Sequence, residues 1–250
     1  MRNNLLKKGL VIGIIILFFG IAVQPITSSD ITQKGEIEQV DEIEQTKDYL
    51  FQTLIDIANN PDVKELLKGN YEVITSDYEF KSVFRQILFK KPMLFFSMLF
   101  TRPKLTHKYL DTSYNRGCEI TNVIGEDKTL DIIESIGITN PKILDDLNNI
   151  IMINEELSNK IIVIVEMNKV LKPDAPFEDY PLICGILLLI FFSCFSVLES
   201  IGMFLYLWGL DDNPIIAGIF RAIALPIYSI LYNSAVLYAS LDCPDPFPYP

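Results

Sequence analysis

The sequence predicts an all-α protein in which an exported multi-helix domain is followed by a two-helix transmembrane hairpin. Half of the residues are hydrophobic and the mean hydropathy is +0.29, yet 21% are charged. This mixture is too apolar for an ordinary soluble domain and too polar for a polytopic transporter. Residues 1 to 29 carry three basic and no acidic side chains, residues 30 to 180 carry 17 and 27, and residues 181 to 250 carry one and five. The three parts therefore face different solvents.

Residues 1 to 29 have the layout of a secretory signal peptide. Arg2, Lys7 and Lys8 precede the apolar run 9 to 23, and the polar run 24 to 29 follows it. These fifteen apolar residues rise only about 22 Å as a helix, less than the roughly 30 Å hydrocarbon core, which favours a signal over a permanent span. An Ala-x-Ala cleavage pattern is missing, so an uncleaved N-terminal anchor is the alternative.

Residues 30 to 172 are predicted to form an exported α-helical domain of six or seven helices. Apolar residues recur at three- and four-residue spacing, and no alternating strand pattern competes. Asn60 and Pro61 are a helix N-cap and first-turn proline, and a Ser-x-x-Glu capping box at 76 to 79 predicts another helix start. The β-branched run 161 to 165 is interpreted as helix, with a buried strand as the alternative. Residues 173 to 181, which contain two prolines before Tyr180, form a short linker.

The C-terminal part is predicted to be a membrane hairpin. Transmembrane helices are expected over 182 to 210 and 215 to 240, with a cytoplasmic turn at 211 to 214 and a Pro-rich tail at 241 to 250. The basic N-terminus indicates that residues 30 to 180 are extracytoplasmic, in the multi-pass topology of a prokaryotic cell-membrane protein.

Two pairs of residues stand out in the hairpin. Glu199 and Arg221 lie at membrane depth, where an ionisable pair is a candidate site for a proton path or for docking a membrane subunit, although a structural ion pair is more common. Cys184 and Cys243 lie at the outer ends of the two helices. A disulfide between them is possible, Cys118 is a rival partner, and unpaired buried thiols are the more frequent state.

A basic, phenylalanine-rich segment interrupts the acidic domain. Between Glu79 and Asp111 there are seven basic and no acidic side chains. Cations around an aromatic apolar stretch are typical of a helix lying on an anionic membrane, whereas a buried central helix with a solvated basic face is the alternative. The candidate lipid or partner surface comprises Lys81, Arg85, Lys90, Lys91, Phe95, Phe96, Phe100, Arg102 and Lys104.

Residues for catalysis or metal binding are not apparent. The single histidine, His107, has no second histidine to share a metal site with and no nucleophile motif nearby. The sequence therefore predicts a protein that is not an enzyme, with no catalytic residues, cofactor or metal. A chain this acidic is also not expected to bind nucleic acid.

The leading hypothesis is a membrane-anchored extracytoplasmic helical domain that binds a membrane or extracellular protein partner or the membrane lipid. The alternative is an accessory subunit of a membrane protein complex, docking through its transmembrane hairpin, in which Gly218 and Ala222 form a small-residue face.

Overall fold

The computed structural model describes residues 37–69, 74–76, 80–100, 103–138, 140–170, 180–210 and 212–244. Within these ranges there are ten helices and one pair of three-residue strands, which confirms the all-α prediction. The signal segment, residues 173 to 179 of the linker and residues 245 to 250 of the tail lie outside the described residues.

The first two helices among the described residues agree with the sequence pattern. Helix α2 (Ile37–Asn59) is followed directly by α3 (Pro61–Gly69). The side-chain oxygen of Asn60 accepts hydrogen bonds from the backbone N–H of Asp62 at 2.9 Å and of Val63 at 3.3 Å, which satisfies two of the free N–H groups at the start of α3.

The capping box predicted at 76 to 79 begins at the last residue of a short strand, and residues 77 to 79 lie outside the described residues, so the exact helix start stays a prediction. Residues Ile74–Ser76 form strand β1, which pairs antiparallel with β2 (Ile136–Ile138) so that Ile74 lies opposite Ile138. Most residues of both segments are β-branched, which favours the strand conformation. Helix α4 (Phe80–Lys90) follows, and Pro92, which lacks a backbone N–H, begins α5 (Pro92–Phe100).

Four further helices complete the part of the chain before the hairpin. They are α6 (His107–Ile124), α7 (Glu126–Glu134), α8 (Pro141–Ile153) and α9 (Glu155–Val170). Gly125, at φ 96°, separates α6 from α7 in a backbone conformation that favours glycine. The side-chain oxygen of Asn154 accepts from the N–H of Leu157 at 3.1 Å and caps α9. The β-branched run 161 to 165 lies inside α9, so the helical interpretation is confirmed.

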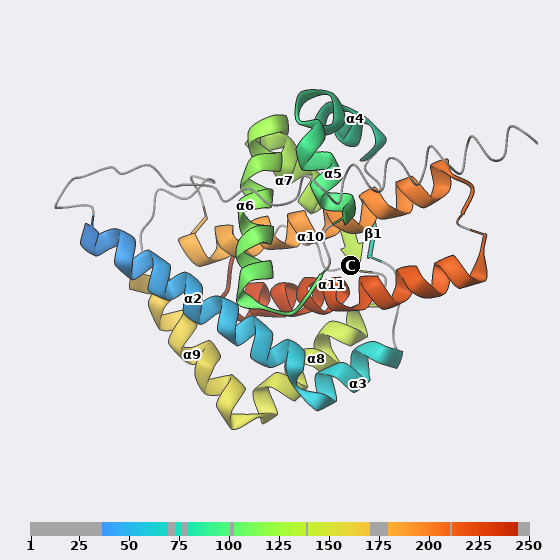
Figure 1. Cartoon of the computed structure of the whole chain (residues 1–250). Coiled ribbons are helices and arrows are strands. Elements are labelled where there is room, and N and C mark those ends of the chain that lie inside the picture. The colour runs from blue at the N-terminus through green and yellow to red at the C-terminus, as the bar shows by residue number, and fades with distance from the viewer. Residues whose placement is uncertain are drawn as a thin grey trace, which may run out of the picture. The chain divides into compact units, whose positions relative to one another are not determined.

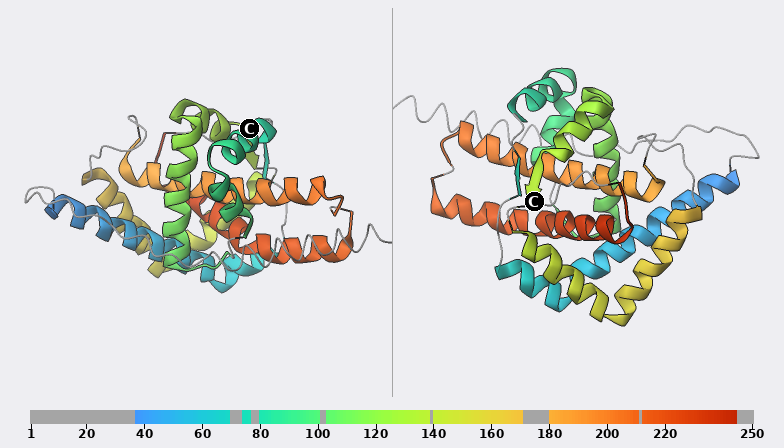
Figure 2. Two further views of the ribbon diagram at one scale, coloured as in Figure 1. Left: turned by 45° about the horizontal axis from the view of Figure 1, so that its top comes forward. Right: turned by 180° about the vertical axis from the view of Figure 1, so that it is seen from behind.

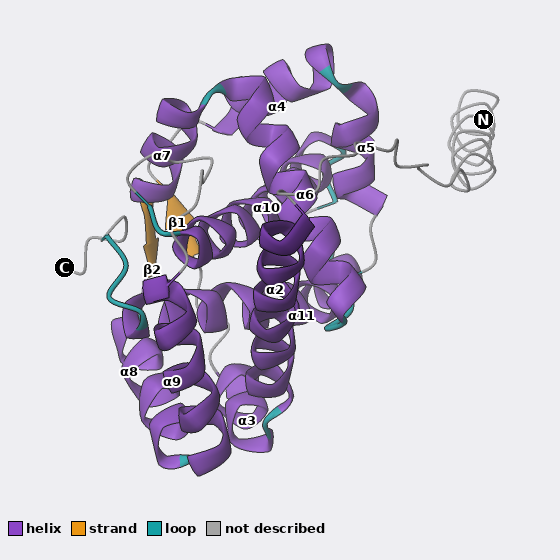
Figure 3. Cartoon of the chain, turned by 90° about the vertical axis from the view of Figure 1, so that its left-hand side faces the viewer, coloured by secondary structure: helices purple, strands orange, loops and turns teal. Residues whose placement is uncertain are grey.

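The last two helices, α10 (Leu182–Leu207) and α11 (Pro214–Ser240), pack against each other as a hairpin. Figures 1 and 2 show this hairpin between two groups of helices, with one end extending beyond both. Helices α5, α6 and α7 pack against α10, whereas α3 and α8 pack against α11. Figure 3, viewed along the hairpin, shows α4 to α7 on one side and α3, α8 and α9 on the other.

One apolar core joins the hairpin to the helices around it. Buried side chains from α2, such as Leu50 and Leu54, belong to the same cluster as Ile186 and Leu188 in α10. Residues 182 to 198 of α10 are buried without exception. The most apolar helix that the structure describes therefore lies at the centre of the core, where its burial removes a large apolar area from water.

Candidate membrane interface

The two helices of the hairpin meet the length and composition expected of membrane spans. The most apolar stretch has a mean hydropathy of 2.5 in α10 and 1.8 in α11. However, 94% of that stretch is buried inside the protein in α10, against 33% in α11. A central core helix of a soluble protein has the same composition, so the exposed part of the hairpin is the more informative part.

The free end of the hairpin exposes large apolar side chains to solvent. Tyr206, Leu207 and Ile215 are 66%, 70% and 73% exposed, and the rings of Phe204 and Trp208 pack 5.6 Å apart. Ile215, Ile219 and Ile223 recur every four residues and so form one stripe along α11. We call the following residues the hairpin tip: Phe204, Tyr206, Leu207, Trp208, Ile215, Ile219 and Ile223.

The hairpin tip is too short to cross a bilayer. In α11 all buried residues lie from Ala224 onward, so residues 214 to 223 are the part not enclosed by the protein. Ten helical residues extend about 15 Å, which is half of the roughly 30 Å hydrocarbon core. A complete span therefore requires the part of α10 that other helices now cover.

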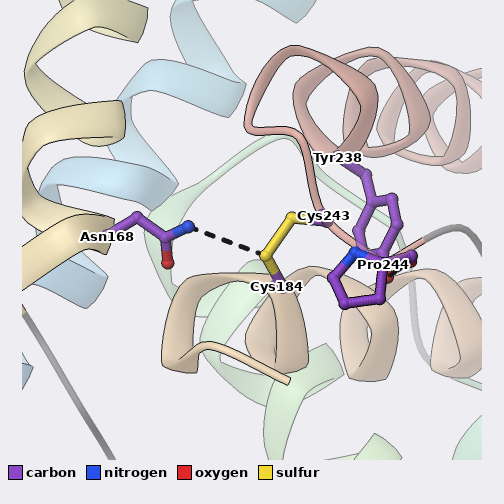
Figure 4. The surroundings of a disulfide bond; sticks show 5 residues. All are labelled: Asn168, Cys184, Tyr238, Cys243 and Pro244. Atoms are coloured by element: carbon purple, nitrogen blue, oxygen red, sulfur yellow. Dashed lines mark hydrogen bonds between the residues drawn. A yellow bond between two sulfur atoms is a disulfide. The ribbon is translucent and has the colours of Figure 1, made fainter. Parts of the chain in front are cut away.

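A disulfide joins the two helices at the opposite end, which we call the hairpin base. Cys184 and Cys243 are bonded, with their Cα atoms 5.9 Å apart, while Cys118 and Cys194 remain free thiols. The side-chain amide of Asn168 donates to the sulfur of Cys184 at 3.7 Å (Figure 4). Tyr238 lies beside Pro244 and donates through its hydroxyl to the Pro244 carbonyl. The bond fixes the axial register of the hairpin.

This register separates Glu199 from Arg221. With Cys184 held level with Cys243, Glu199 lies level with Tyr228, and the two side chains interact electrostatically. Arg221 is about seven residues, or about 10 Å, nearer the turn. No ion pair joins Glu199 to Arg221 among the residues that the structure describes. The two side chains therefore do not form an ion pair with each other here, because the count from the turn placed them closer in depth than the disulfide register does. A docking role of either residue stays a prediction.

Helix α6 packs closely against the base of α10. A Cβ atom added at Gly117 would lie 2.4 Å from the backbone oxygen of Leu189, so only glycine allows the two helices to approach this closely. One turn away, the sulfur of Cys194 lies 4.0 Å from the hydroxyl oxygen of Ser113. Figures 1 and 2 show the two helices crossing steeply at this contact.

Polar groups share this interface. Arg116 is 5% exposed and donates to the carbonyl of Ser97 in α5 at 3.5 Å. Burial lowers the pKa of Arg116 and raises that of Tyr109, whose ring also lies on α6. The side of α6 that faces α10 therefore holds a cation and hydroxyl groups as well as a glycine.

The basic, phenylalanine-rich segment divides between the core and the surface. Phe95 is buried against Phe84 at 6.5 Å between ring centroids, so it does not belong to the surface predicted for it. Phe96 is partly buried, and Lys104 is exposed. The side chains of Lys81 and Arg102 lie outside the described residues.

The exposed part of this segment lies where α4 ends and α5 begins. Phe89 is 78% exposed and Met93 is 64% exposed. Lys90 donates to the carbonyl of Val123 at 3.0 Å, and Lys91 lies 3.8 Å from Glu119. We call the following residues the α4–α5 corner: Arg85, Leu88, Phe89, Lys90, Lys91 and Met93. Phe100 is also exposed, but it lies at the far end of α5.

The single histidine has a packing role. Its Nε2 lies 3.0 Å from a carboxylate oxygen of Asp48, and its ring packs edge-on against Phe51 at 5.1 Å. Among the described residues, no group of three or more His, Cys, Asp and Glu side chains could hold a metal ion.

No protein-family model, curated protein or solved structure matches this chain significantly. The proposals below therefore rest on surfaces of the chain itself, among which the hairpin tip and the α4–α5 corner combine exposed apolar side chains with interfacial aromatic or basic residues.

Proposed function

We propose that this chain is a membrane-anchored helical protein whose α10–α11 hairpin enters the bilayer while its other helices act outside it. The exposed hairpin tip carries this proposal. Seven large apolar side chains at the end of two apolar helices are costly in water and favourable in lipid. Tyr206 and Trp208 are the residue types that concentrate at the edges of the hydrocarbon region.

The proposed topology keeps the helices before the hairpin on the extracytoplasmic side of the cell membrane. The Cys184 to Cys243 disulfide at the hairpin base supports it, since disulfides persist in oxidising compartments outside the cytoplasm. The short acidic turn containing Asp212 would lie on the cytoplasmic side.

The helices outside the bilayer are proposed to bind the lipid surface through the α4–α5 corner. Its cations, Arg85, Lys90 and Lys91, are exposed, and residues 80 to 100 contain no acidic side chain. Glu119 of α6, 3.8 Å from Lys91, offsets one of these charges. In a chain with a formal net charge of −11, this corner is a local exception that an anionic membrane attracts while the rest is repelled. Phe89 and Met93 can enter the headgroup boundary beside the cations.

A specific observation also supports the accessory-subunit alternative. Gly218 and Ala222 are exposed, and a Cβ atom at Gly218 would meet no atom within 4 Å. Small residues on a helix face that carries Ile215 and Ile219 allow another transmembrane helix to approach closely. In this alternative the same stripe of α11 contacts a membrane protein instead of lipid.

Trp208 is the only tryptophan of the chain and lies in the hairpin tip, so its fluorescence tests the proposal without a label. The full chain is reconstituted in vesicles containing lipids brominated along the acyl chains. Strong quenching is expected, because bromine quenches tryptophan only at close range. Quenching by aqueous acrylamide with no effect of the brominated lipids would exclude lipid contact by the tip.

The α4–α5 corner is tested by Lys90→Glu with Lys91→Glu in the full chain. Each cation at an anionic surface contributes about 1 kcal/mol, so the double reversal should weaken partitioning onto anionic vesicles by at least about 2 kcal/mol. The matched control is Lys64→Glu with Lys142→Glu, two exposed lysines on α3 and α8 that change the net charge equally. An equal loss in both double variants would indicate a net-charge effect rather than a binding surface.

A further inference from the structure

The hairpin cannot span a membrane completely while the other helices pack against it as described above. Only about 15 Å of the hairpin is bare, and the apolar run needed to complete a span, residues 182 to 198, is enclosed by α5, α6, α7 and α11. Inserting the tip alone would leave Asp212, which is exposed at the turn, near the middle of the bilayer. An acidic side chain is most costly at that depth.

We propose that the hairpin has two states: the closed state described here, and a membrane-spanning state in which α6 has left the base of α10 and lipid has taken its place. The inference rests on the proposed function and specifies how the hairpin reaches the far side of the membrane. In the spanning state the acidic turn emerges into water, which removes the cost of leaving Asp212 within the hydrocarbon.

The α10 side of the interface favours lipid as a replacement for α6. Its apolar stretch has a mean hydropathy of 2.5, well into the range of membrane spans. Lipid chains are as apolar as the side chains that cover α10 now, so exchanging one cover for the other costs α10 little transfer free energy.

The α6 side of the interface is partly polar, although Leu110 and Ile120 are also fully buried on this helix. Tyr109, Ser113 and Arg116 are buried on α6 beside Cys194 of α10, and each carries a polar group that water solvates well. Because burial lowers the pKa of Arg116, exposing this side chain relieves a desolvation cost of its charged form. By contrast, the buried face of α2 is lined by Leu50, Phe51 and Leu54, which have no such compensation.

The hairpin can move as one unit. Helices α10 and α11 pack along each other, and the Cys184 to Cys243 bond closes their base in either state. Opening therefore breaks the contacts of α10 with α5, α6 and α7 and those of α11 with α3 and α8, but not the contact within the hairpin.

A disulfide between α6 and α10 tests the proposal. The hydroxyl oxygen of Ser113 lies 4.0 Å from the sulfur of Cys194, so Ser113→Cys places two thiols within reach of a bond after a small side-chain shift. The variant is oxidised in the closed state, the new bond is verified by peptide mapping, and the full chain is added to vesicles with iodide either trapped inside or supplied outside. The matched control carries Ser113→Cys together with Cys194→Ser and cannot form the bond.

The fluorescence of Trp208 reports the position of the hairpin tip. In the control, trapped iodide should quench Trp208, and external iodide should not. In the oxidised variant, quenching by trapped iodide should fall to background. Equal quenching by trapped iodide in both proteins would show that the hairpin spans with α6 in place. Background quenching in both would show that it never crosses the membrane. Either result overturns the inference, while the brominated-lipid measurement reports independently whether the tip enters the membrane at all.

A second variant destabilises the closed state instead of locking it, and it does not require a new disulfide. Gly117→Ala forces a Cβ atom against the backbone at Leu189, whereas Gly202→Ala on α10 meets open space. Overpacking at Gly117 weakens the closed state, so the rate at which Trp208 becomes quenchable by trapped iodide should rise about tenfold. An unchanged or slower rate relative to Gly202→Ala would contradict the two-state proposal.

Discussion

The base and the tip of one helical hairpin have nearly the same composition and opposite surroundings. Residues 182 to 198 of α10 are enclosed by other helices of the chain, while Leu207 and Ile215 at the tip are 70% and 73% exposed. The hydrophobic effect alone does not distinguish the two, because both are apolar. The difference is made by the helices packed on the base of α10, which are α5, α6 and α7, and Gly117 of α6 allows especially close packing there, at Leu189.

We expect that truncating a large side chain to alanine lowers the free energy of unfolding much more at the hairpin base than at the hairpin tip. Phe191 at the base is 1% exposed, so Phe191→Ala should lower the free energy of unfolding by about 3 to 5 kcal/mol. Leu207→Ala at the tip should change it by less than about 0.5 kcal/mol, because an exposed side chain leaves no cavity. Urea unfolding of the purified full chain in mild detergent measures both. Similar losses at the two sites would mean that the tip is packed in the folded protein.

Removing the base disulfide should have the next largest effect. The bond closes a sequence separation of 59 residues, and such loops stabilise the folded state by about 2 to 4 kcal/mol through the entropy of the unfolded chain. Cys184→Ser with Cys243→Ser should lower the unfolding free energy by that amount under non-reducing conditions. Adding a reductant to the unsubstituted chain should reproduce the loss, and a reductant should have no further effect on the double variant.

These effects also show what the sequence could and could not reveal. Periodicity and capping residues predict α2, α3, α8 and α9 well, because such signals are local. The strands β1 and β2 escape prediction because each has three residues and gains its stability from a partner 62 positions away. Hydropathy locates α10 and α11, yet it cannot tell a buried core helix from a membrane span, since both are apolar all round.

The prediction of site residues fails where it depends on the position of a residue along the hairpin axis or on the face of the helix that it occupies. Phe95 and Phe89 belong to the same basic, aromatic segment, but only Phe89 is exposed, and this depends on which face of α4 or α5 meets the core. Glu199 and Arg221 appear paired when counted from the turn, and the disulfide register separates them. The stripe of Ile215, Ile219 and Ile223 has a visible four-residue spacing, but nothing in the sequence indicates that the α11 base is covered and its tip is not.

The last predicted effect concerns two glycines, Gly117 of α6, which packs on the hairpin base, and Gly202, which lies on α10 beyond the buried residues 182 to 198. Gly117→Ala should destabilise the folded chain by about 1 to 3 kcal/mol, because the added Cβ atom would lie 2.4 Å from the backbone oxygen of Leu189. At Gly202 the same change meets no atom within 4 Å, so the gain in helix propensity should stabilise the chain by up to about 1 kcal/mol. Opposite signs in urea unfolding would confirm that close packing by α6 distinguishes the base from the rest of the hairpin. The same sign at both positions would mean that the α6–α10 contact is not this close in solution.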